Sequence, residues 1–506
     1  MTEKNIETDE QPEGLGKQLK RGVFWQYFQT GFNTVFKFGT GVVLARLLDP
    51  SDFGLFAAVT SITNLLLMQI NFGWTSALLR AKQLDKMLLS TVFWFMQAIA
   101  ILLMGAVVIF VPYFTAFYQD DRFGPVMLLV CLQFFIVPFN IINGGILRWK
   151  MRYDLVSRIA MAVSIISSVT GISLAYFGFG VYSLVVTGLL SSILVTIIMA
   201  FYAPWKPMFL FSLDAVKPHF DFTWRLHLNN SLNLLAGRID NLMVGKLVGL
   251  SSLGIYVKAF SLGRMPVDLL ARNLYQMFFT ALSRVRESQS GSLVMFQKMI
   301  GALTFSIYLP LLLLLFLGEG FIFHLYGEKW LGAVLPMRIM IIGSFVIVIT
   351  MTSGAFCAAQ NLVRKETKVQ FLNLIMTITA VLIGSKWGLP GISIGIVIKA
   401  FIMLYLMKKV LEKGIGLKWR DLWKPVWPNV CAALIASLLV LLLVYGFNLS
   451  GAETNIVRMA SIAFTICSGY LITWFFLALS LKSHPEMVPI LDLAQTAVTK
   501  MSGKIQ

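Results

Sequence analysis

Charge and cysteine are scarce in this chain. Only 13% of its 506 residues are charged, whereas an ordinary soluble domain has about 25%. Cys131, Cys357, Cys431 and Cys467 stand alone in apolar segments without metal or redox spacing, so we interpret them as small hydrophobic residues. The sequence has no P-loop, no H-E-x-x-H motif and no cysteine–histidine cluster, which argues against an ATPase or a metalloenzyme and predicts no cofactor.

The beginning of the chain lacks a signal-peptide pattern. Residues 1–16 are polar and acidic, with no basic stretch followed by an apolar core, so we expect no cleaved signal peptide there. We predict that residues 1–21 form a short disordered cytoplasmic tail. One match to G-x-S-x-G, at Gly391–Gly395, lies within a predicted transmembrane helix rather than a strand–turn–helix, which argues against a catalytic serine.

Apolar sequence, by contrast, is abundant. Hydrophobic residues make up 57% of the chain, and the mean hydropathy is +0.77. They form blocks of about 20 residues, long enough to cross the hydrocarbon core, where backbone amides must be paired within a helix. We therefore predict an all-α polytopic membrane protein. Its 14 predicted spans are 22–45, 53–77, 87–112, 125–144, 158–176, 180–202, 224–247, 253–279, 296–317, 333–357, 367–385, 389–407, 428–446 and 457–481.

The basic residues predict the orientation of these spans. The chain has 42 Lys and Arg against 24 Asp and Glu, a net charge of +18. With the N-terminus in the cytoplasm, 29 of the 42 fall in predicted cytoplasmic segments and 6 in predicted outer loops. This alternation follows the positive-inside rule and predicts that both termini are cytoplasmic. The basic excess is therefore a topology signal and does not indicate a nucleic-acid partner.

An internal repeat divides the chain. Residues 46–56 and 246–256 share Leu, Ser and Gly at an offset of 200, and residues 178–183 resemble residues 388–393. Six spans thus repeat as six spans in the same orientation, as parallel repeats do, and two spans remain at the C-terminus. The predicted segments are a tail (1–21), an N-lobe (22–203), a cytoplasmic linker (204–223), a C-lobe (224–410), a cytoplasmic loop (411–427), two further spans (428–481) and a cytoplasmic tail (482–506).

Several spans carry polar residues that lipid would not tolerate. An ionisable group at the bilayer centre costs roughly 2.5–3.5 kcal/mol even on the mildest scale. In the first span the polar residues lie within an arc of about 80°, and in the eighth they lie within about 120° and extend for about 27 Å. These stripes are Gln26, Gln29, Asn33, Lys37 and Thr40, and Lys258, Ser261, Arg264, Asp268, Arg272 and Gln276.

The seventh span carries polar residues on two sides. If it is one helix, Asn233 and Asp240 lie opposite His227 and Arg238. In the eighth span, Pro266 predicts a kink or hinge.

Two interpretations of these charges remain open. The charges are structural if Arg264–Asp268 and Asp268–Arg272 form i,i+4 pairs and Arg238 packs between helices. The eighth-span stripe, however, has three basic residues and one acidic residue, a surplus of +2. We therefore favour a cationic, water-filled cavity for an anionic substrate such as a phosphate or an acidic sugar.

Four segments carry a family resemblance: Ala45–Phe56, Arg238–Asn241, Gly254–Tyr256 and Tyr326–Trp330. The last also has the composition of an interfacial turn with an aromatic anchor. With them the chain resembles the oligosaccharidyl-lipid flippase branch of the multidrug/oligosaccharidyl-lipid/polysaccharide (MOP) superfamily, and within it the Wzx-type exporters of colanic acid and exopolysaccharide.

The resemblance implies a fold and an activity. The fold has two six-helix lobes in a V-shaped, MATE-like arrangement around a central cavity. The activity is movement of undecaprenyl-diphosphate-linked repeat units across the bacterial cytoplasmic (inner) membrane by alternating access, for exopolysaccharide or lipopolysaccharide biosynthesis. The implied partners are the lipid-linked oligosaccharide, membrane lipid, a polysaccharide polymerase and a chain-length regulator.

The resemblance also implies roles for single residues. The substrate would meet Lys37, Arg238, Lys258, Arg264 and Arg272. Asp240 and Asp268 are the candidates for coupling to an ion gradient.

Two other functions compete with this one. A MATE-like drug or cation antiporter needs a mainly acidic pocket, whereas the residues within these spans are mostly basic. A membrane-embedded polymerase or glycosyltransferase needs catalytic or nucleotide-binding groups in a sizeable loop, and the predicted outer loops are too short.

Overall fold

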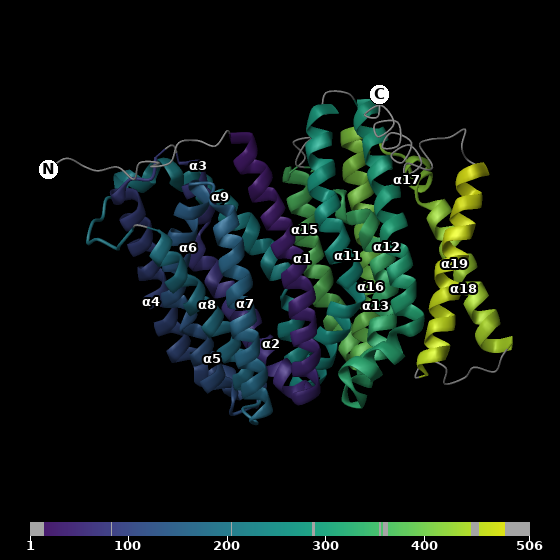
Figure 1. Ribbon diagram of the computed structural model, residues 1–506, viewed down its shortest axis with the longest axis horizontal. Coiled ribbons are helices and arrows are strands. Elements are labelled where there is room, and N and C mark those ends of the chain that lie inside the picture. Colours follow the sequence, from purple (N-terminus) through teal and green to yellow (C-terminus); the bar gives the residue numbers. More distant parts are fainter. Residues whose placement is uncertain are drawn as a thin grey trace. The chain divides into compact units, whose positions relative to one another are not determined.

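The computed structural model describes residues 15–81, 83–203, 205–285, 289–353, 356–357, 363–446 and 455–480, and all regular structure within these ranges is helical (Figure 1). The chain forms two compact units, residues 1–254 and 255–506. Helix α11 (Leu250–Val285) begins in unit 1 and continues in unit 2.

The other helices of unit 1 are α1 (Leu15–Leu47), α2 (Pro50–Asn71), α3 (Trp74–Arg80), α4 (Lys86–Tyr118), α5 (Phe123–Cys131), α6 (Gln133–Trp149), α7 (Tyr153–Tyr176), α8 (Val181–Tyr202), α9 (Leu213–Ala236) and α10 (Ile239–Leu247). Those of unit 2 are α12 (Gln289–Tyr326), η1 (Glu328–Ala333), α13 (Val334–Met351), α15 (Val363–Gly384), η2 (Ser385–Trp387), α16 (Gly388–Ile415), α17 (Trp419–Trp423), α18 (Trp427–Gly446) and α19 (Ile456–Ser480).

The described residues contain ten helical stretches long and apolar enough to cross a membrane. Nine of them match predicted spans two to six, nine, ten, thirteen and fourteen, and Lys365–Ile415 covers spans eleven and twelve. The protein is therefore an all-α integral membrane protein. Spans one, seven and eight are not among the stretches found in the described residues; the polar stripes lie in spans one and eight, and span seven is divided between α9 and α10. The count of 14 stays a prediction.

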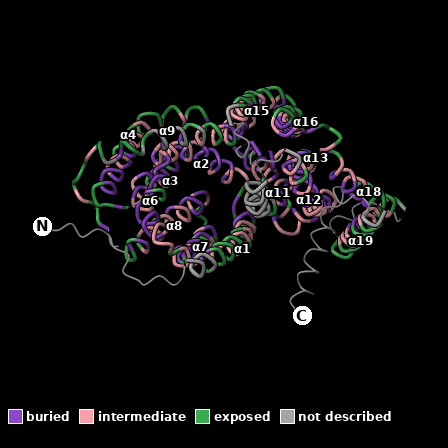
Figure 2. Tube along the Cα trace, turned by 90° about the horizontal axis from the view of Figure 1, so that it is seen from above, coloured by how far each residue is buried: buried purple, intermediate pink, exposed green. Residues whose placement is uncertain are grey.

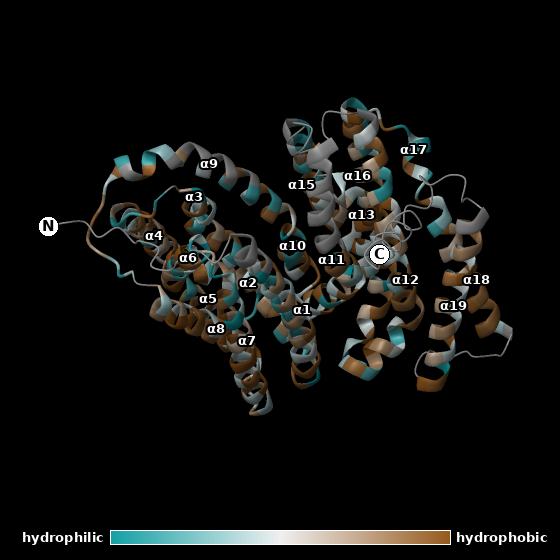
Figure 3. Ribbon diagram, turned by 45° about the horizontal axis from the view of Figure 1, so that its top comes forward, coloured by the Kyte–Doolittle hydropathy of each residue, from teal (hydrophilic) through white to brown (hydrophobic). Residues whose placement is uncertain are grey.

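Hydropathy separates these polar helices from the others. Figure 3 shows hydrophilic residues along α9, whereas α18 and α19 are mostly hydrophobic. Figure 2 shows buried residues along α2, which packs against α4, α5, α6, α8, α9 and α10 within unit 1.

The prediction of one continuous helix for span seven was wrong. Helix α9 ends at Ala236, and α10 begins at Ile239 after the non-helical Arg238 (φ −130°, ψ −13°). Gly237 is a poor residue for a helix interior, by about 1 kcal/mol relative to alanine. Since the helix is interrupted here, the sides assigned to Arg238 and Asp240 on a single helix no longer hold.

Spans two and four are broken as well. Helix α2 ends at Asn71 and is followed by Phe72 (φ 46°) and Gly73 (φ 82°), both left-handed, before α3. Span four is divided into α5 and α6 at Leu132.

The first turn of α2 is fixed by a cap and by an ion-pair cluster. Asp49 caps α2 and Pro50 occupies its first turn, where a missing N–H costs nothing. Asp52 is buried and accepts a 2.8 Å hydrogen bond from Arg122 Nη1. Arg122 Nη2 and Nε also donate to Asp120, at 2.9 and 3.1 Å. This cluster joins α2 to the turn between α4 and α5.

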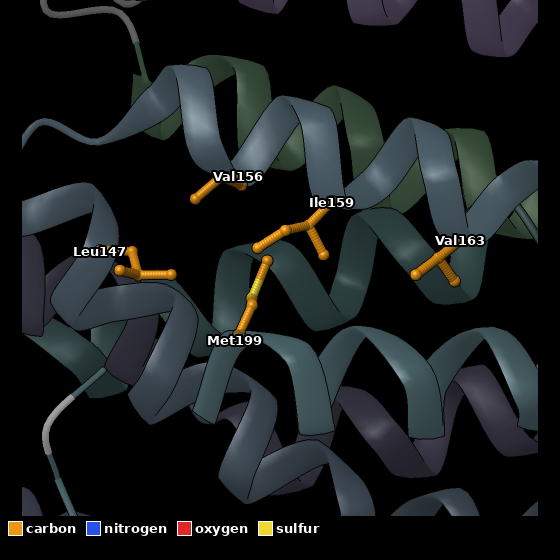
Figure 4. Close-up of a cluster of buried hydrophobic side chains, with 5 residues drawn as sticks. All are labelled: Leu147, Val156, Ile159, Val163 and Met199. Atoms are coloured by element: carbon orange, nitrogen blue, oxygen red, sulfur yellow. The ribbon is translucent and has the colours of Figure 1, made fainter. Parts of the chain in front are cut away.

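Helix α1 lies along α7, held at one end by an ion pair and a ring contact. Arg21 Nη2 lies 3.1 Å from Asp154 Oδ2, and the Arg158 guanidinium lies 4.6 Å from the Trp25 ring. One face of α8 packs into α6 and α7 through a buried cluster drawn in Figure 4. The members of the cluster are Leu147, Val156, Ile159, Val163 and Met199.

The two copies of the first repeated segment touch within unit 1. A Cβ at Gly54 would overlap the carbonyl oxygen of Leu250, and a Cβ at Gly254 would overlap that of Pro50. Gly54 and Gly254 are 200 residues apart, as are Pro50 and Leu250. The contact is therefore reciprocal, which supports the repeat inferred from the sequence. The full six-helix repeat stays a prediction.

The second repeated segment shows a shared backbone conformation. Gly180 (φ 54°, ψ −134°) precedes α8, and Gly388 (φ 66°, ψ −154°) begins α16. These angles are close to a region that glycine alone adopts readily. By backbone angles, Gly388 thus corresponds to Gly180. The sequence comparison aligns Gly388 with Gly178, two residues earlier.

Unit 2 is built around α12. Tyr308 donates to the Phe345 carbonyl of α13 (3.1 Å), and Asn429 of α18 donates to Thr304 (2.8 Å). Tyr470 of α19 donates to the Phe305 carbonyl (3.2 Å). The two C-terminal helices therefore pack on α12 through hydrogen bonds as well as apolar contact.

Candidate functional site

Helices α9 and α10 lie against α2 and α4 within unit 1. His227, one of the polar residues of span seven, is buried there. Its Nε2 lies 2.9 Å from Gln69 Oε1, and its ring stacks on Phe72 with centroids 4.6 Å apart. These contacts give His227 a packing role. The sequence did not reveal Gln69 or Phe72 as its partners, because they lie on another span.

Asp240 and Asn241 are buried at the start of α10. Asp240 Oδ1 accepts the Asn241 backbone N–H at 2.8 Å, and Asn241 Nδ2 donates to Ser61 Oγ at 3.2 Å. Ser61 belongs to α2 and is buried as well. The Arg238–Asn241 motif therefore docks α10 on α2. Arg238 is half-buried in the break before α10.

Lys37 has a different environment on α1. Its side chain is exposed and forms no ion pair with any described residue. One turn earlier, Asn33 Oδ1 is buried and has no hydrogen-bond donor in the described part of the chain. The polar stripe of α1 thus offers a cation and an unused amide oxygen.

Lys258 lies in an aromatic cradle of unit 2. Its Nζ is 4.5 Å from the Tyr326 ring centroid and 5.2 Å from that of Trp330. Such contacts contribute about 0.5–2 kcal/mol. Trp330 is fully buried, so the expectation of an aromatic anchor at the membrane surface was wrong: the ring packs inward. Lys258, two residues after the repeated segment 246–256, thus contacts the Tyr326–Trp330 segment.

Arg264 and Asp268 form the i,i+4 pair that the structural interpretation foresaw. Arg264 Nη2 lies 3.5 Å from Asp268 Oδ1, and the guanidinium lies 5.3 Å from the Phe260 ring. The Asp268 side chain is 59% exposed, so the pair is weak. Arg264 Nε is buried and has no acceptor among the described residues. Arg264 therefore keeps a donor that a ligand oxygen would satisfy.

Helix α11 does not end at Pro266. The proline has no N–H for the carbonyl one turn before it, and the neighbouring Gly263 carbonyl accepts a 2.9 Å hydrogen bond from Ser344 Oγ of α13. A hydroxyl on an adjacent helix commonly supports the backbone near a membrane proline in this way. The hinge at Pro266 stays a prediction.

The side chain of Arg272 lies outside the described residues. Among the other predicted site residues, the structure brings together only Arg264 and Asp268 in the part of the chain that it describes. Lys37, Arg238 and Asp240 belong to unit 1, and Lys258, Arg264 and Asp268 to unit 2.

Known proteins are similar to this chain in sequence or in fold. The chain is 21% identical to the lipopolysaccharide biosynthesis protein WzxC of Escherichia coli (strain K12) over 392 residues, which is 76% of this chain and 79% of that protein. Its fold resembles the lipid II flippase MurJ in an inward closed conformation (TM-score 0.72, 15% identity, 91% of this chain and 99% of that chain).

A second solved structure is also similar. It is the inward-facing conformation of a multidrug resistance MATE family transporter of the MOP superfamily (TM-score 0.61, 17% identity, 76% of this chain and 94% of that chain). At these identities both solved structures show the fold alone. The sequence pattern of one family matches residues 43–335, more than half of the chain. The protein therefore belongs to the family of polysaccharide biosynthesis proteins.

Proposed function

We propose that this protein is a flippase, not an enzyme, which moves undecaprenyl-diphosphate-linked oligosaccharide repeat units across the cytoplasmic membrane. It acts by alternating access and supplies exopolysaccharide or lipopolysaccharide biosynthesis. Family membership supports a role in polysaccharide biosynthesis, and the likeness to WzxC and to the MurJ fold supports a lipid-linked substrate.

The observation that carries the proposal is the state of Arg264. A guanidinium is always charged and presents donors in a fork that matches phosphate oxygens. Here one of those donors is buried without an acceptor among the described residues, and the ion-pair partner Asp268 is more than half exposed and 3.5 Å away. A diphosphate would therefore replace a weak ion pair with stronger charge-assisted hydrogen bonds.

In unit 1, Lys37 is a second candidate cation for binding the anionic substrate. Its exposed ammonium and the nearby Asn33 amide suit an anionic, hydroxyl-rich ligand. Lys258 and Arg238 contribute charge, and we assign Lys258 mainly to the aromatic cradle because its Nζ already lies over two rings. A cationic cavity that contains these groups together with Arg272 remains our prediction, as does ion coupling through Asp240 or Asp268.

Charge reversal at the stripe tests the proposal. We expect the double variant Arg264→Glu/Arg272→Glu to abolish polymer export, since repulsion replaces attraction for the diphosphate, while the protein still inserts in the membrane. Export is measured as surface polysaccharide in a strain that lacks its own copy, and insertion by membrane fractionation.

Arg420→Glu is the matched control, because Arg420 is exposed on the short helix α17. It makes the charge reversal of one of the two substitutions, outside the stripe, and should leave export intact. Normal export from a well-expressed double variant would refute a substrate role for the stripe.

The fold alone also suits a MATE-like drug or cation antiporter. Drug-resistance profiles of cells that express the protein separate the two functions, because only the antiporter raises the inhibitory concentrations of cationic drugs. A polysaccharide polymerase and a chain-length regulator are the proposed partners, and co-purification from crosslinked membranes tests them.

A further inference from the structure

A cavity of about 730 Å³ opens in unit 1 beside the end of α8, away from the residues discussed above. Its lining comes from the first residue of α4, the last turns of α8 and the segment that follows α8. The lining residues are Lys86, Ile197, Ala200, Phe201, Ala203, Trp205, Lys206 and Met208. Apart from the two lysines, all of these side chains are apolar or aromatic.

The segment after α8 is held firmly on α4. Trp94 Nε1 donates to the Met208 carbonyl at 2.7 Å, and the Ser212 N–H donates to Thr91 Oγ1 at 3.1 Å. The Trp205 ring packs edge-on against Phe93, with centroids 5.5 Å apart. These contacts come from three points along the segment, so the wall that carries Trp205, Lys206 and Met208 is part of the packed structure.

Two unneutralised charges stand at this cavity. Lys86 and Lys206 are exposed, and neither forms an ion pair or hydrogen bond with a described residue. The nearest acidic residue in sequence, Asp85, uses its carboxylate to accept the Leu88 N–H at 2.6 Å as the cap of α4. The described residues of the lining include no carboxylate. An occupant with negative charge is therefore favoured over a neutral or zwitterionic one.

An apolar track leads away from the cavity along α8. Ile193, Ile197 and Phe201 are spaced by four residues, lie on one helix face and are 38%, 48% and 84% exposed. The other face of α8 is used in packing, since Met199 is buried among α6 and α7 residues (Figure 4). The exposed row thus remains available to a hydrocarbon chain.

Both lysines lie on the predicted cytoplasmic side, Lys86 before the third span and Lys206 after the sixth. The cytoplasmic leaflet is where anionic lipids attract basic residues, at about 1 kcal/mol per Lys or Arg. Among its described residues the lining offers no hydroxyl, amide or carboxylate side chain to bind a glycan, which argues against the sugar-bearing substrate as its occupant.

We propose that this cavity binds an anionic phospholipid of the cytoplasmic leaflet. Its phosphate lies between Lys86 and Lys206, and one acyl chain follows Ile193, Ile197 and Phe201. Binding here requires no transport, so failure of this proposal leaves the proposed function untouched.

Native mass spectrometry of the full-length, detergent-purified protein tests the headgroup. We expect phosphatidylglycerol to bind several-fold more tightly than phosphatidylethanolamine. We expect Lys86→Gln/Lys206→Gln to weaken phosphatidylglycerol binding roughly tenfold or more, as the loss of two interfacial charges implies. The control Lys217→Gln/Lys413→Gln removes two other exposed lysines and should keep the wild-type affinity. Equal affinities for the two lipids, or equal losses in both double variants, would overturn the proposal.

Photolabelling tests the position and the source of the ligand. A phosphatidylglycerol with a photoactivatable acyl chain should label α8 peptides that contain residues 193–201, and unlabelled phosphatidylglycerol should compete. Inorganic phosphate should not compete, because it has no chain. Labelling elsewhere, or displacement by inorganic phosphate alone, contradicts the proposal. Displacement by undecaprenyl phosphate at lower concentration than phosphatidylglycerol also contradicts it, since the cavity would then hold the prenyl carrier.

Discussion

At the residue scale, several buried or partly buried polar and charged side chains have specific neighbours. Asp52 is held by Arg122, Asn241 by Ser61, and Lys258 by two aromatic rings. Arg264 differs because one of its donors is buried without an acceptor. A charge that lacks a full set of partners in the resting protein is the natural place to expect a ligand, and this is why Arg264 carries the functional proposal.

Because of the Asp120–Arg122 pair, we expect the stability of the folded protein to depend on pH. Burial alone would raise the pKa of Asp120, but the hydrogen bonds and charge of Arg122 outweigh it and hold the pKa below the ordinary value of 3.8. A lowered pKa means that the folded protein favours the carboxylate. The Asp120 carboxylate therefore contributes fully to the free energy of unfolding above its ordinary pKa. This contribution is lost as the pH falls through the lower pKa of the folded protein.

We expect Asp120→Asn to lower stability by roughly 0.5–1 kcal/mol at neutral pH, since the pair is partly exposed. The difference from the wild type should vanish in acid below the lowered pKa. Thermal unfolding of detergent-purified protein over a pH series measures it. Asp121→Asn is the control, because Asp121 is exposed. A pH-independent difference would show that the carboxylate charge does not act through Arg122.

At the element scale, the decisive features are helix breaks and helix contacts. The break at Gly237–Arg238 separates α9 from α10 and lets Asp240 and Asn241 point into the packing against α2. The contact between Gly54 and Gly254 lets α2 and the first turn of α11 approach to backbone distance. Only glycine permits this approach, because each missing Cβ leaves room for a carbonyl of the other helix.

Because of this close contact, we expect any side chain at Gly54 or Gly254 to lower the stability of the protein. We expect Gly54→Ala and Gly254→Ala each to destabilise the protein by about 1–3 kcal/mol, the usual range for overpacking, because backbone atoms must move. The double variant should lose less than the sum, since the two glycines share one contact. Thermal unfolding and expression yield report the effect.

Gly105→Ala is the matched control for this pair. Gly105 lies in α4, and a Cβ there would meet no atom within 4 Å. We expect it to be neutral or slightly stabilising, as alanine is the better helix former. Gly54→Ala that unfolds at the wild-type temperature would mean that the two helices are not in the contact described.

At the scale of the whole molecule, family membership and the membrane-spanning helices agree on a membrane protein of polysaccharide biosynthesis. Each unit has its own packing centre, α2 in unit 1 and α12 in unit 2. The sequence repeat and the compact units divide the chain at different places: helices α9 and α10 pack with unit 1, whereas the repeat begins its second copy at residue 224. The predicted lobe boundaries stay a prediction.

The topology predicts where reporters will be active. With both termini in the cytoplasm, a C-terminal green fluorescent protein should fluoresce and a C-terminal alkaline phosphatase should be inactive. An alkaline phosphatase inserted after Asp120, in a predicted outer loop, should be active. If the N-terminus is cytoplasmic, activity of the C-terminal phosphatase fusion would show that the count of 14 spans is wrong by an odd number.

The sequence by itself determined the class of the protein. Long apolar blocks must be helices in a membrane, the Lys and Arg alternation predicts their direction, and the four short segments indicated the family that residues 43–335 then confirmed. These properties are local or periodic along the chain, so they can be inferred without knowledge of the tertiary contacts. The same is true of the polar stripes, because helical spacing alone places those residues on one face.

Only the tertiary structure shows what each described polar residue contacts. Lys258, a predicted substrate-binding residue, lies beside Tyr326 and Trp330, some 70 residues away in sequence. The break at Gly237 also changed the angles inferred for Arg238 and Asp240. The cavity between Lys86 and Lys206 joins segments about 120 residues apart. Partners of this kind follow from packing between distant helices, and no periodicity along a single helix reveals them.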